Sequence, residues 1–394
     1  YKRQGNVHYV GVNDRNKHRF EGMWPLPYGV SYNSYLIDDE MVALVDTVDI
    51  CYFEVYLRKI KQVIGERPIN YLIINHMEPD HSGSIRLIKQ HYPEIIIVGN
   101  KQTFGMIEGF YGVTGEQYLV KEGDFLALGH HKLRFYMTPM VHWPETMMTF
   151  DETDGVLFSG DGFGCFGTVD GGFLDTRINV DKYWGEMVRY YSNIVGKYGS
   201  PVQKALQKLG GLPISAICST HGPVWTENIA KVIGIYDRLS RYDADEGVVI
   251  AYGSMYGNTE QMAEAIAEEL SAQGVKNIVM HNVTKSHPSY ILADIFRYKG
   301  LIIGSPTYSN QIFPEVEALL SKILLREVKG RYLGYFGSFT WAGAAVKRLA
   351  EFAEKSKFEL VGDPVEMKQA MKDLTYTQCE NLARAMADRL KKDR

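Results

Sequence analysis

From Val248 to the end, the chain alternates apolar runs with helical patterns, and this alternation constrains the fold more than any other feature. The order is strand "VVIAYGS", helix "TEQMAEAIAEELSAQG", strand "KNIVMHNV", helix "YILADIFRY" and strand "KGLIIGSP", followed by helix, strand and helix. Near-continuous apolar strands separated by amphipathic helices indicate a parallel sheet with helices on both faces. We therefore predict a doubly wound α/β domain over residues 247–394.

The preceding residues, 1–246, follow a different pattern. Runs such as "YNSYLID", "YLIIN" and "GVLFSGD" concentrate Val, Ile and aromatic residues between Gly, Asp and Pro, which is typical of strands. A chain of 394 residues also exceeds what one core usually organises. We therefore predict a separate, sheet-rich α/β domain over residues 1–246.

The composition indicates which classes of partner the protein can bind and in which compartment it works. A net charge of -4 supplies no basic stripe for nucleic acid. No run approaches the ~18 apolar residues of a membrane helix, and the start "YKRQGNVHYV" lacks the apolar core of a signal peptide. The four cysteines form no CxxC pair, which argues against an iron–sulfur or rubredoxin-type centre within the chain. We expect a cytoplasmic protein that binds neither nucleic acid nor membrane and receives any electrons from a separate partner.

Potential metal ligands follow four predicted strands of the first domain. His76 follows "YLIIN" and opens the cluster "HMEPDH", and His142 lies just past "LRFYMTP". Asp161 follows "GVLFSG", and His221 follows "ISAICST". Strand ends on one side of a sheet are neighbours in space, so these side chains can converge. Taken alone, "HMEPDH" could be a polar loop that caps a helix, because Asp and Ser often cap helices. The candidate ligands are His76, Glu78, Asp80, His81, His142, Asp161 and His221.

The remaining histidines lack such companions, and we expect them to be surface or satisfied core histidines. They are His8, His18, His91, His130, His131, His281 and His287. A literal GxGxxG, from Gly162 to Gly167, also follows a strand, but the chain continues "TVDGGFLD" without a helical pattern. The dinucleotide interpretation therefore fails, and we expect these glycines to make room beside the metals.

In the second domain, "YGSMYGNTEQ" places hydroxyl and amide groups between a strand and a helix, where a phosphate can bind the helix N-terminus. The loop lacks the Lys of a Walker A motif, which disfavours nucleotide triphosphate hydrolysis. This half resembles flavodoxin, and the resemblance places "GSPTYSNQIFP" and "FGSFTWAGAA" around an isoalloxazine ring, with Trp341 as the stacking candidate. The alternatives are a flavodoxin-like fold without flavin and a Trp341 that only packs. The candidate flavin-binding residues are Ser254, Met255, Tyr256, Gly257, Asn258, Thr259, Pro306, Thr307, Tyr308, Asn310, Ser338, Phe339, Thr340, Trp341 and Gly343.

The first half resembles the metallo-β-lactamase-like αββα sandwich, in the variant found in flavodiiron proteins. The resemblance rests on "HMEPDH" followed by "VHWPE", "GDGFG" and "STHGP". Zinc hydrolases of this fold usually read HxHxDH, whereas Glu78 here replaces an imidazole with a hard oxygen ligand, which favours iron or manganese over zinc.

The resemblance also implies which residues hold each metal. One metal would bind His76, Glu78, His142 and Asp161, and the other Asp80, His81, Asp161 and His221, with Asp161 bridging and the role of His81 left open. Tyr190 and Tyr191 are candidates to supply a hydroxyl next to the ligands, with Tyr191 chosen as the catalytic candidate, and the alternative is that both only pack on a helix face. The loop segment Trp24–Pro27 could line the entrance to the metals.

The fusion of both halves resembles the flavodiiron proteins over essentially the whole chain. This resemblance implies FMN, two Fe in a diiron centre, and reduction of dioxygen to water, of nitric oxide to nitrous oxide, or both. It also implies an external donor, such as rubredoxin or a flavin- or NADH-linked reductase, and a head-to-tail homodimer or dimer of dimers. Two rival interpretations are a zinc-dependent, thioesterase-like hydrolase fused to a flavodoxin module and a non-catalytic electron-transfer flavoprotein.

Overall fold

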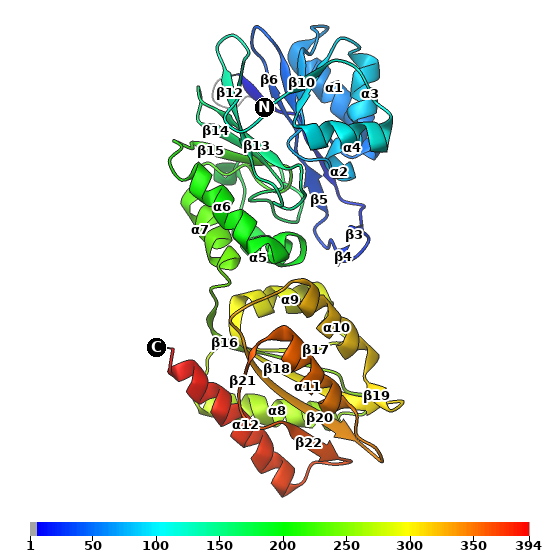
Figure 1. The fold of residues 1–394 in the computed structure, drawn as a ribbon, viewed down its shortest axis with the longest axis vertical. Helices are drawn as coiled ribbons and strands as arrows, with labels where there is room; N and C mark the ends of the chain where they lie inside the picture. The colour runs from blue at the N-terminus through cyan, green and yellow to red at the C-terminus, as the bar shows by residue number, and fades with distance from the viewer. Residues whose placement is uncertain (1–5, 394) are drawn as a thin grey trace. The chain divides into compact units, whose positions relative to one another are not determined.

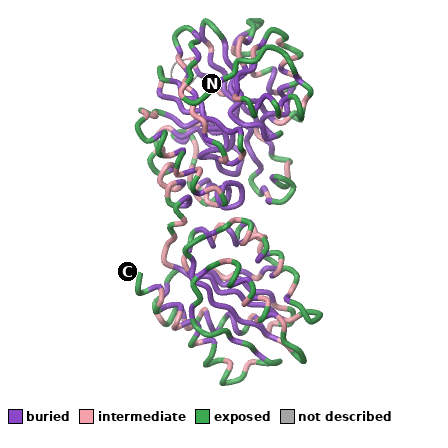
Figure 2. Tube along the Cα trace, in the orientation of Figure 1, coloured by how far each residue is buried: buried purple, intermediate pink, exposed green. Residues whose placement is uncertain are grey.

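The computed structural model describes residues 6–393 and divides the chain into two compact units, one ending at Ser240 and the other beginning at Arg241 (Figure 1). The sequence pattern placed the boundary at 246/247. The difference arises because the first strand of the second unit begins at Asp245, and because Arg331 of that unit donates a hydrogen bond to the Tyr242 carbonyl. Each unit encloses its own buried core (Figure 2).

The first unit contains two sheets that face each other. One has the order β1 (Val7–Tyr9), β6 (Tyr35–Ile37), β7 (Ala43–Val45), β8 (Tyr71–Ile73), β9 (Ile96–Gly99) and β10 (Gln117–Leu119). The other has the order β11 (Phe125–Ala127), β12 (Lys132–Met137), β13 (Met147–Asp151), β14 (Val156–Gly160) and β15 (Ala216–Ser219). Val45 and Ile73 of the first sheet share a buried cluster with Phe135 and Phe158 of the second.

Helices cover the outer side of each sheet (Figure 1). Beside the first sheet lie α1 (Phe53–Ile64), α2 (Pro79–Ser82), α3 (Ile85–His91) and α4 (Lys101–Tyr111). Beside the second lie α5 (Asp181–Tyr190), α6 (Gly199–Leu209) and α7 (Ile229–Ser240). The buried positions of α1, which include Phe53, Tyr56 and Ile60, recur every three or four residues, as expected of a helix with one face on a core. The predicted αββα sandwich is confirmed.

Two small pairs of strands complete the first unit. β2 (Val12–Asp14) pairs with β5 (Val30–Tyr32), and β3 (Arg19–Phe20) pairs with β4 (Trp24–Pro25). The β3–β4 hairpin matters for function because it contributes to the cavity described below.

The second unit is a parallel sheet with helices on both faces, as the sequence predicted. Its strand order is β17 (Ile278–Asn282), β16 (Asp245–Tyr252), β18 (Tyr298–Tyr308), β20 (Tyr332–Phe339) and β21 (Glu359–Leu360), with β22 (Val365–Lys368) also on β20 and β19 (Gln311–Ile312) on β18. On one face lie α8 (Asn258–Ala272) and α12 (Asp373–Lys391), and on the other α9 (Pro288–Arg297), α10 (Pro314–Leu325) and α11 (Ala345–Ser356) (Figure 1). This is the flavodoxin-like order, in which ligands bind beyond the carboxyl ends of the strands. No helix within residues 6–393 is long and apolar enough to cross a membrane.

Candidate metal centre and flavin site

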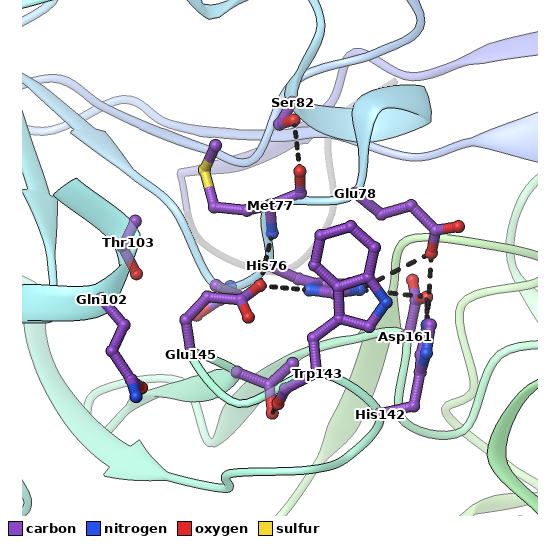
Figure 3. Close-up of polar contacts among 12 residues, drawn as sticks. His76, Met77, Glu78, Ser82, Gln102, Thr103, His142, Trp143, Glu145 and Asp161 are labelled. Atoms are coloured by element: carbon purple, nitrogen blue, oxygen red, sulfur yellow. Dashed lines mark hydrogen bonds and ion pairs between the residues drawn. The ribbon is translucent and has the colours of Figure 1, made fainter. Parts of the chain in front are cut away.

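The candidate ligands of the first unit converge because each follows a strand end. His76 lies three residues after β8, His142 lies in the loop after β12, Asp161 directly follows β14, and His221 lies two residues after β15. All seven predicted side chains are buried, none being more than 8% exposed. Figure 3 shows His76, Glu78, His142 and Asp161 pointing toward one another.

Four of these residues form a first group of facing ligand atoms. Nε2 of His142 lies 3.2 Å from Oε2 of Glu78 and 3.1 Å from Oδ2 of Asp161. Nε2 of His76 lies 3.6 Å from the same Glu78 oxygen and 3.7 Å from the same Asp161 oxygen. Two imidazole nitrogens and two carboxylate oxygens thus face one point.

A second group forms around the other oxygen of Asp161. Nε2 of His81 lies 3.2 Å from Oδ1 of Asp161 and 3.7 Å from Oδ1 of Asp80. Nε2 of His221 lies 3.5 Å from Oδ1 of Asp161 and 3.3 Å from Oδ2 of Asp80. The two oxygens of Asp161 therefore face different groups. A ligand atom of His81 reaches both, because it lies within 4.8 Å of ligand atoms of His76, Glu78 and Asp161 and also of those of Asp80 and His221.

The site has buried polar atoms that a cation would satisfy. Nε2 of His76, His81 and His221 and both carboxylate oxygens of Asp80 are buried without a hydrogen-bond partner. Such atoms are costly to bury unless something pairs with them. Three carboxylates and four neutral imidazoles nearly balance two divalent ions, and an all-nitrogen and oxygen donor set suits iron or manganese. The residues present therefore fit two metal ions.

Protons compete for the same atoms. Burial disfavours the imidazolium of His81, but the carboxylates of Asp161 and Asp80 outweigh it and raise the pKa of His81 to about 10. Burial is likewise outweighed at His142, where Asp161 and Glu78 raise the pKa to about 10. Burial favours the neutral form of Glu78, yet hydrogen bonds from His142 and His76 lower its pKa to about 2. Because metals bind neutral imidazole, metal binding here releases protons.

Three further residues hold the ligands in place. Nδ1 of His76 lies 2.7 Å from Oε1 of Glu145, which also accepts from the Met77 amide (Figure 3). Nδ1 of His221 lies 2.7 Å from the Ser31 carbonyl, and the hydroxyl of Thr220 donates to Oδ1 of Asp161 at 2.5 Å. Such contacts fix the tautomer and orientation of ligands. Sequence reasoning missed Glu145, Ser31 and Thr220, although "VHWPE" and "STHGP" contain two of them.

The two tyrosines occupy different surroundings. The ring of Tyr190 lies 5.9 Å from that of His221, and its buried hydroxyl has no hydrogen-bond partner. Burial, followed by the nearby charge of Asp161, raises the pKa of Tyr190 well above its usual range. The ring of Tyr191 instead packs on Tyr236 at 5.1 Å. Tyr190 thus lies next to a ligand, and a role for Tyr191 stays a prediction.

A cavity of about 710 Å³ opens beside the candidate ligands Glu78 and Asp80. The β3–β4 hairpin contributes Phe20, Glu21 and Gly22 to its lining, and Lys17, Arg86 and Tyr111 lie elsewhere on its wall. Trp24 of the same hairpin is only 1% exposed, and its indole donates to Glu21. The segment Trp24–Pro27 was expected at the entrance, but the preceding residues line it because the indole is turned into the core.

The glycine-rich stretch after β14 lies beside the metal ligands. No helix follows it before Asp175, as expected. A Cβ at Gly164 would lie 3.1 Å from the Asp161 carbonyl and 3.4 Å from the Tyr190 ring. A side chain there would crowd both residues.

The second unit has a cavity of about 400 Å³ at the carboxyl ends of its strands. All the predicted flavin-binding residues line it except Gly257 and Gly343. Ser309, Ala342 and Gln369 also line it and were not predicted. Gly257 instead shapes the loop before α8, where its φ of 89° suits glycine.

The lining of this cavity combines polar groups with exposed aromatic rings. Near the N-terminus of α8, the hydroxyl of Ser254 accepts from the Gly257 amide, and those of Thr259 and Ser338 lie 2.8 Å apart. No Lys or Arg lines the cavity, so neutral donors and the helix end would hold a phosphate. Trp341 and Tyr256, which also line the cavity, are 82% and 90% exposed. Such exposed aromatic faces suit a flat ring.

Comparisons with known proteins agree with the folds described for both units. The family described as "ODP family beta lactamase" matches residues 30–222, and the flavodoxin family matches residues 250–382. An anaerobic nitric oxide reductase flavorubredoxin of Vibrio vulnificus is 33% identical over 90% of this chain and 73% of its own length. Its counterpart in Escherichia coli is 31% identical over 91% of this chain and 76% of its own length.

Solved structures show the same two-unit chain. The rubredoxin oxygen:oxidoreductase of Desulfovibrio gigas has a TM-score of 0.94 and 31% identity, covering 98% of this chain and 97% of that one. The flavodiiron protein of Giardia intestinalis has a TM-score of 0.92 and 27% identity, covering 98% and 95%. With its ligand groups, its cavity and these relatives, the chain belongs to the flavodiiron protein family of oxidoreductases.

Proposed function

We propose that this protein reduces dioxygen, nitric oxide or both at a diiron centre, with electrons relayed through FMN from an external donor. One observation carries the proposal: the two oxygens of Asp161 face different imidazoles, Oδ2 that of His142 at 3.1 Å and Oδ1 that of His81 at 3.2 Å. We assign one iron to His76, Glu78, His142 and Asp161, and the other to Asp80, His81, Asp161 and His221.

The bound cofactors would supply the electrons. Two irons and one reduced FMN together hold the four electrons that turn dioxygen into two waters, and two electrons suffice to join two nitric oxide molecules as nitrous oxide. The residues of the chain prepare the site for this chemistry. Glu145 keeps the proton of His76 on Nδ1, so that Nε2 is free to ligate. Thr220 holds Oδ1 of Asp161 by donating its hydroxyl hydrogen.

Apolar rings limit the water around the ligands. The ring of Phe20 is 1% exposed and lies edge-on to His221 at 5.3 Å, and Trp143 lies edge-on to His76 at 5.2 Å. A small, weakly polar diatomic can pass such rings more easily than an ion. The cavity beside Glu78 and Asp80 is the proposed route of entry.

We further propose that the flavin binds in the cavity beside α8, with its phosphate at the helix N-terminus and Trp341 on the ring. Rubredoxin, or a flavin- or NADH-linked reductase, is the proposed donor, and the name of the similar rubredoxin oxygen:oxidoreductase of Desulfovibrio gigas supports the first of these. We also propose a cytoplasmic protein that works as a head-to-tail homodimer, alone or as a dimer of dimers.

The test uses iron-loaded, FMN-loaded protein with reduced rubredoxin and follows dioxygen and nitric oxide with electrodes. The variant His142→Asn is expected to lose more than about tenfold in turnover, since even the partners behind ligands contribute 10–100-fold. His91→Asn, an exposed histidine on α3, is the matched control and is expected to keep wild-type turnover. Undiminished turnover in His142→Asn would contradict the proposal, as would zinc-dependent thioesterase activity without gas reduction.

A further inference from the structure

A second group of potential metal ligands lies in the first unit, away from the centre described above. His131, Asp151 and Asp154 each offer one ligand atom, and these atoms lie within 4.8 Å of one another. Leu133 pairs with Asp151 at one end of the β12–β13 ladder, whereas the chain reaches His142 from the other end, at Met137. The group therefore lies at the opposite end of these strands from the metal centre.

His131 is positioned like a metal ligand, contrary to the expectation of an ordinary histidine. Its side chain is 1% exposed, and Nδ1 lies 2.9 Å from Oδ2 of Asp151, which is fully buried. Its Nε2 is buried without a hydrogen-bond partner. His76 shows the same arrangement, with Nδ1 on Glu145 and Nε2 left for a metal. A carboxylate on Nδ1 that orients Nε2 is the usual support of a ligating histidine.

The surroundings of His131 are negatively charged. Oδ2 of Asp154 is also buried without a hydrogen-bond partner, and Asp39 accepts from the amides of His130 and His131. Within residues 6–393, the side-chain oxygens of Asp39, Asp151 and Asp154 have no Lys or Arg nitrogen within 4.0 Å, and Arg67 donates only to the backbone carbonyl of Asp39. Three carboxylates around one imidazole leave an excess of negative charge, which favours a cation.

The two turns that carry these residues are fastened together. The hydroxyl of Thr153 donates to the His130 carbonyl and accepts from the Lys132 amide. The Thr153 amide donates to Oδ1 of Asp151. The β11–β12 turn and the β13–β14 turn are therefore held in one arrangement, so a metal there would not have to assemble its ligands.

We propose that Nε2 of His131 and the carboxylate of Asp154 bind a single divalent cation of the Zn²⁺ class, with Asp151 orienting His131. Nitrogen and oxygen donors suit Zn²⁺, and water completes the coordination. The ion ties the two turns to each other and takes no part in the reduction of gases. The site does not rest on the function proposed above.

The experiment measures zinc retained by iron-loaded protein after incubation with Zn²⁺ and desalting, by elemental analysis. Wild type is expected to retain one zinc per chain more than Asp154→Asn, and His131→Gln is expected to behave like Asp154→Asn. His130→Gln, the exposed neighbour, is the matched control and is expected to retain as much zinc as wild type. Asp154 lies in a turn and is only half-buried, so Asp154→Asn keeps the comparison informative even where His131→Gln fails to fold.

A zinc titration measures the affinity of the proposed site for Zn²⁺. The Kd for Zn²⁺ of the extra site is expected to rise at least about tenfold in Asp154→Asn, while iron content stays that of wild type. Equal zinc retention by wild type and Asp154→Asn would overturn the proposal and would mean that His131 is held by its carboxylates alone. If His130→Gln lost as much zinc as Asp154→Asn, the proposal would also be overturned, since the binding would then be adventitious.

Discussion

Nδ1 of His76 lies 2.7 Å from Oε1 of Glu145, a carboxylate with no exposed surface that also accepts from the Met77 amide. Hydrogen bonds from His76 and from the Met77 amide outweigh the effect of burial and lower the pKa of Glu145. The ionised carboxylate therefore favours the proton on Nδ1 of His76 and leaves Nε2 available for a metal. The ligand is positioned by a residue that need not touch the metal.

Replacing Glu145 should weaken iron binding. Glu145→Gln keeps the size of the side chain but removes the charge, so we expect iron affinity to fall about 10–100-fold, as for other partners behind metal ligands. A competitive chelator titration measures this. Glu108→Gln, on the exposed side of α4, is the control and should titrate like wild type. Equal iron affinity in Glu145→Gln and Glu108→Gln would show that His76 does not depend on its partner.

Removing the exposed indole beside the second cavity should weaken flavin binding. Trp341 is 82% exposed, so Trp341→Ala should leave the fold unchanged. Loss of its stacking, worth about 1 kcal/mol, should raise the Kd for FMN about five- to tenfold. Quenching of FMN fluorescence measures the Kd, with the exposed Leu374→Ala as control. An unchanged Kd in Trp341→Ala would mean that this indole does not stack on the flavin.

Asp175 should make the first unit sensitive to acid. Burial raises its pKa, but hydrogen bonds from the Thr226 hydroxyl and the Thr226 and Asn228 amides outweigh burial and lower the pKa below 3.8. A lowered folded-state pKa contributes stability that is present above the unfolded pKa and lost as pH falls through the folded one. At pH 7, Asp175→Asn should lower the free energy of unfolding by about 2 kcal/mol.

This difference between wild type and Asp175→Asn should shrink as pH falls below about 4, where the unfolded-state carboxylate takes up its proton. Urea unfolding of both metal-free proteins between pH 7 and pH 3 measures it. A stability difference that stays constant between pH 7 and pH 3 would show that the ionised carboxylate of Asp175 does not stabilise the segment from Thr226 to Asn228.

Arg331 should be essential to the second unit. Its guanidinium is 1% exposed and donates only to carbonyls, which include those of Ile295, Phe296 and Tyr242. Burial lowers its pKa to about 10. Arg331→Met would leave these carbonyls without donors, so we expect the free energy of unfolding to fall by about 3 kcal/mol. Release of FMN during urea unfolding reports it, with the exposed Arg297→Met as control. Equal stability of the two variants would contradict this role.

Much of the metal centre could be predicted because strand ends place their residues together whatever the detailed packing. His76, His142, Asp161 and His221 each follow an apolar run, and one sheet end collects them. Glu145 and Ser31 could not be predicted in the same way. Glu145 contacts Nδ1 of His76, and the Ser31 carbonyl contacts Nδ1 of His221. These contacts depend on side-chain orientation, which sequence spacing does not encode.

Side-chain orientation and long-range contacts also explain the other points at which the structure differs from the sequence predictions. Adjacent residues on a helix point about 100° apart, so "YY" could not show that Tyr190 and not Tyr191 lies beside His221. Gln369 lies just after β22 and reaches the flavin cavity from a strand that the phosphate-loop pattern does not include. No sequence pattern indicated companions for His131, because Asp151 and Asp154 lie 20 and 23 residues further on, across a strand pair.

The central claim is that this chain holds two irons around Asp161 and one flavin, and uses them as an oxidoreductase. Elemental analysis and visible absorption of protein expressed with iron supplied test it most directly. The account predicts two irons and one FMN per chain, with iron content falling in Asp161→Ala while FMN is retained. Zinc in place of iron and no flavin, in protein whose sites are full, would contradict it.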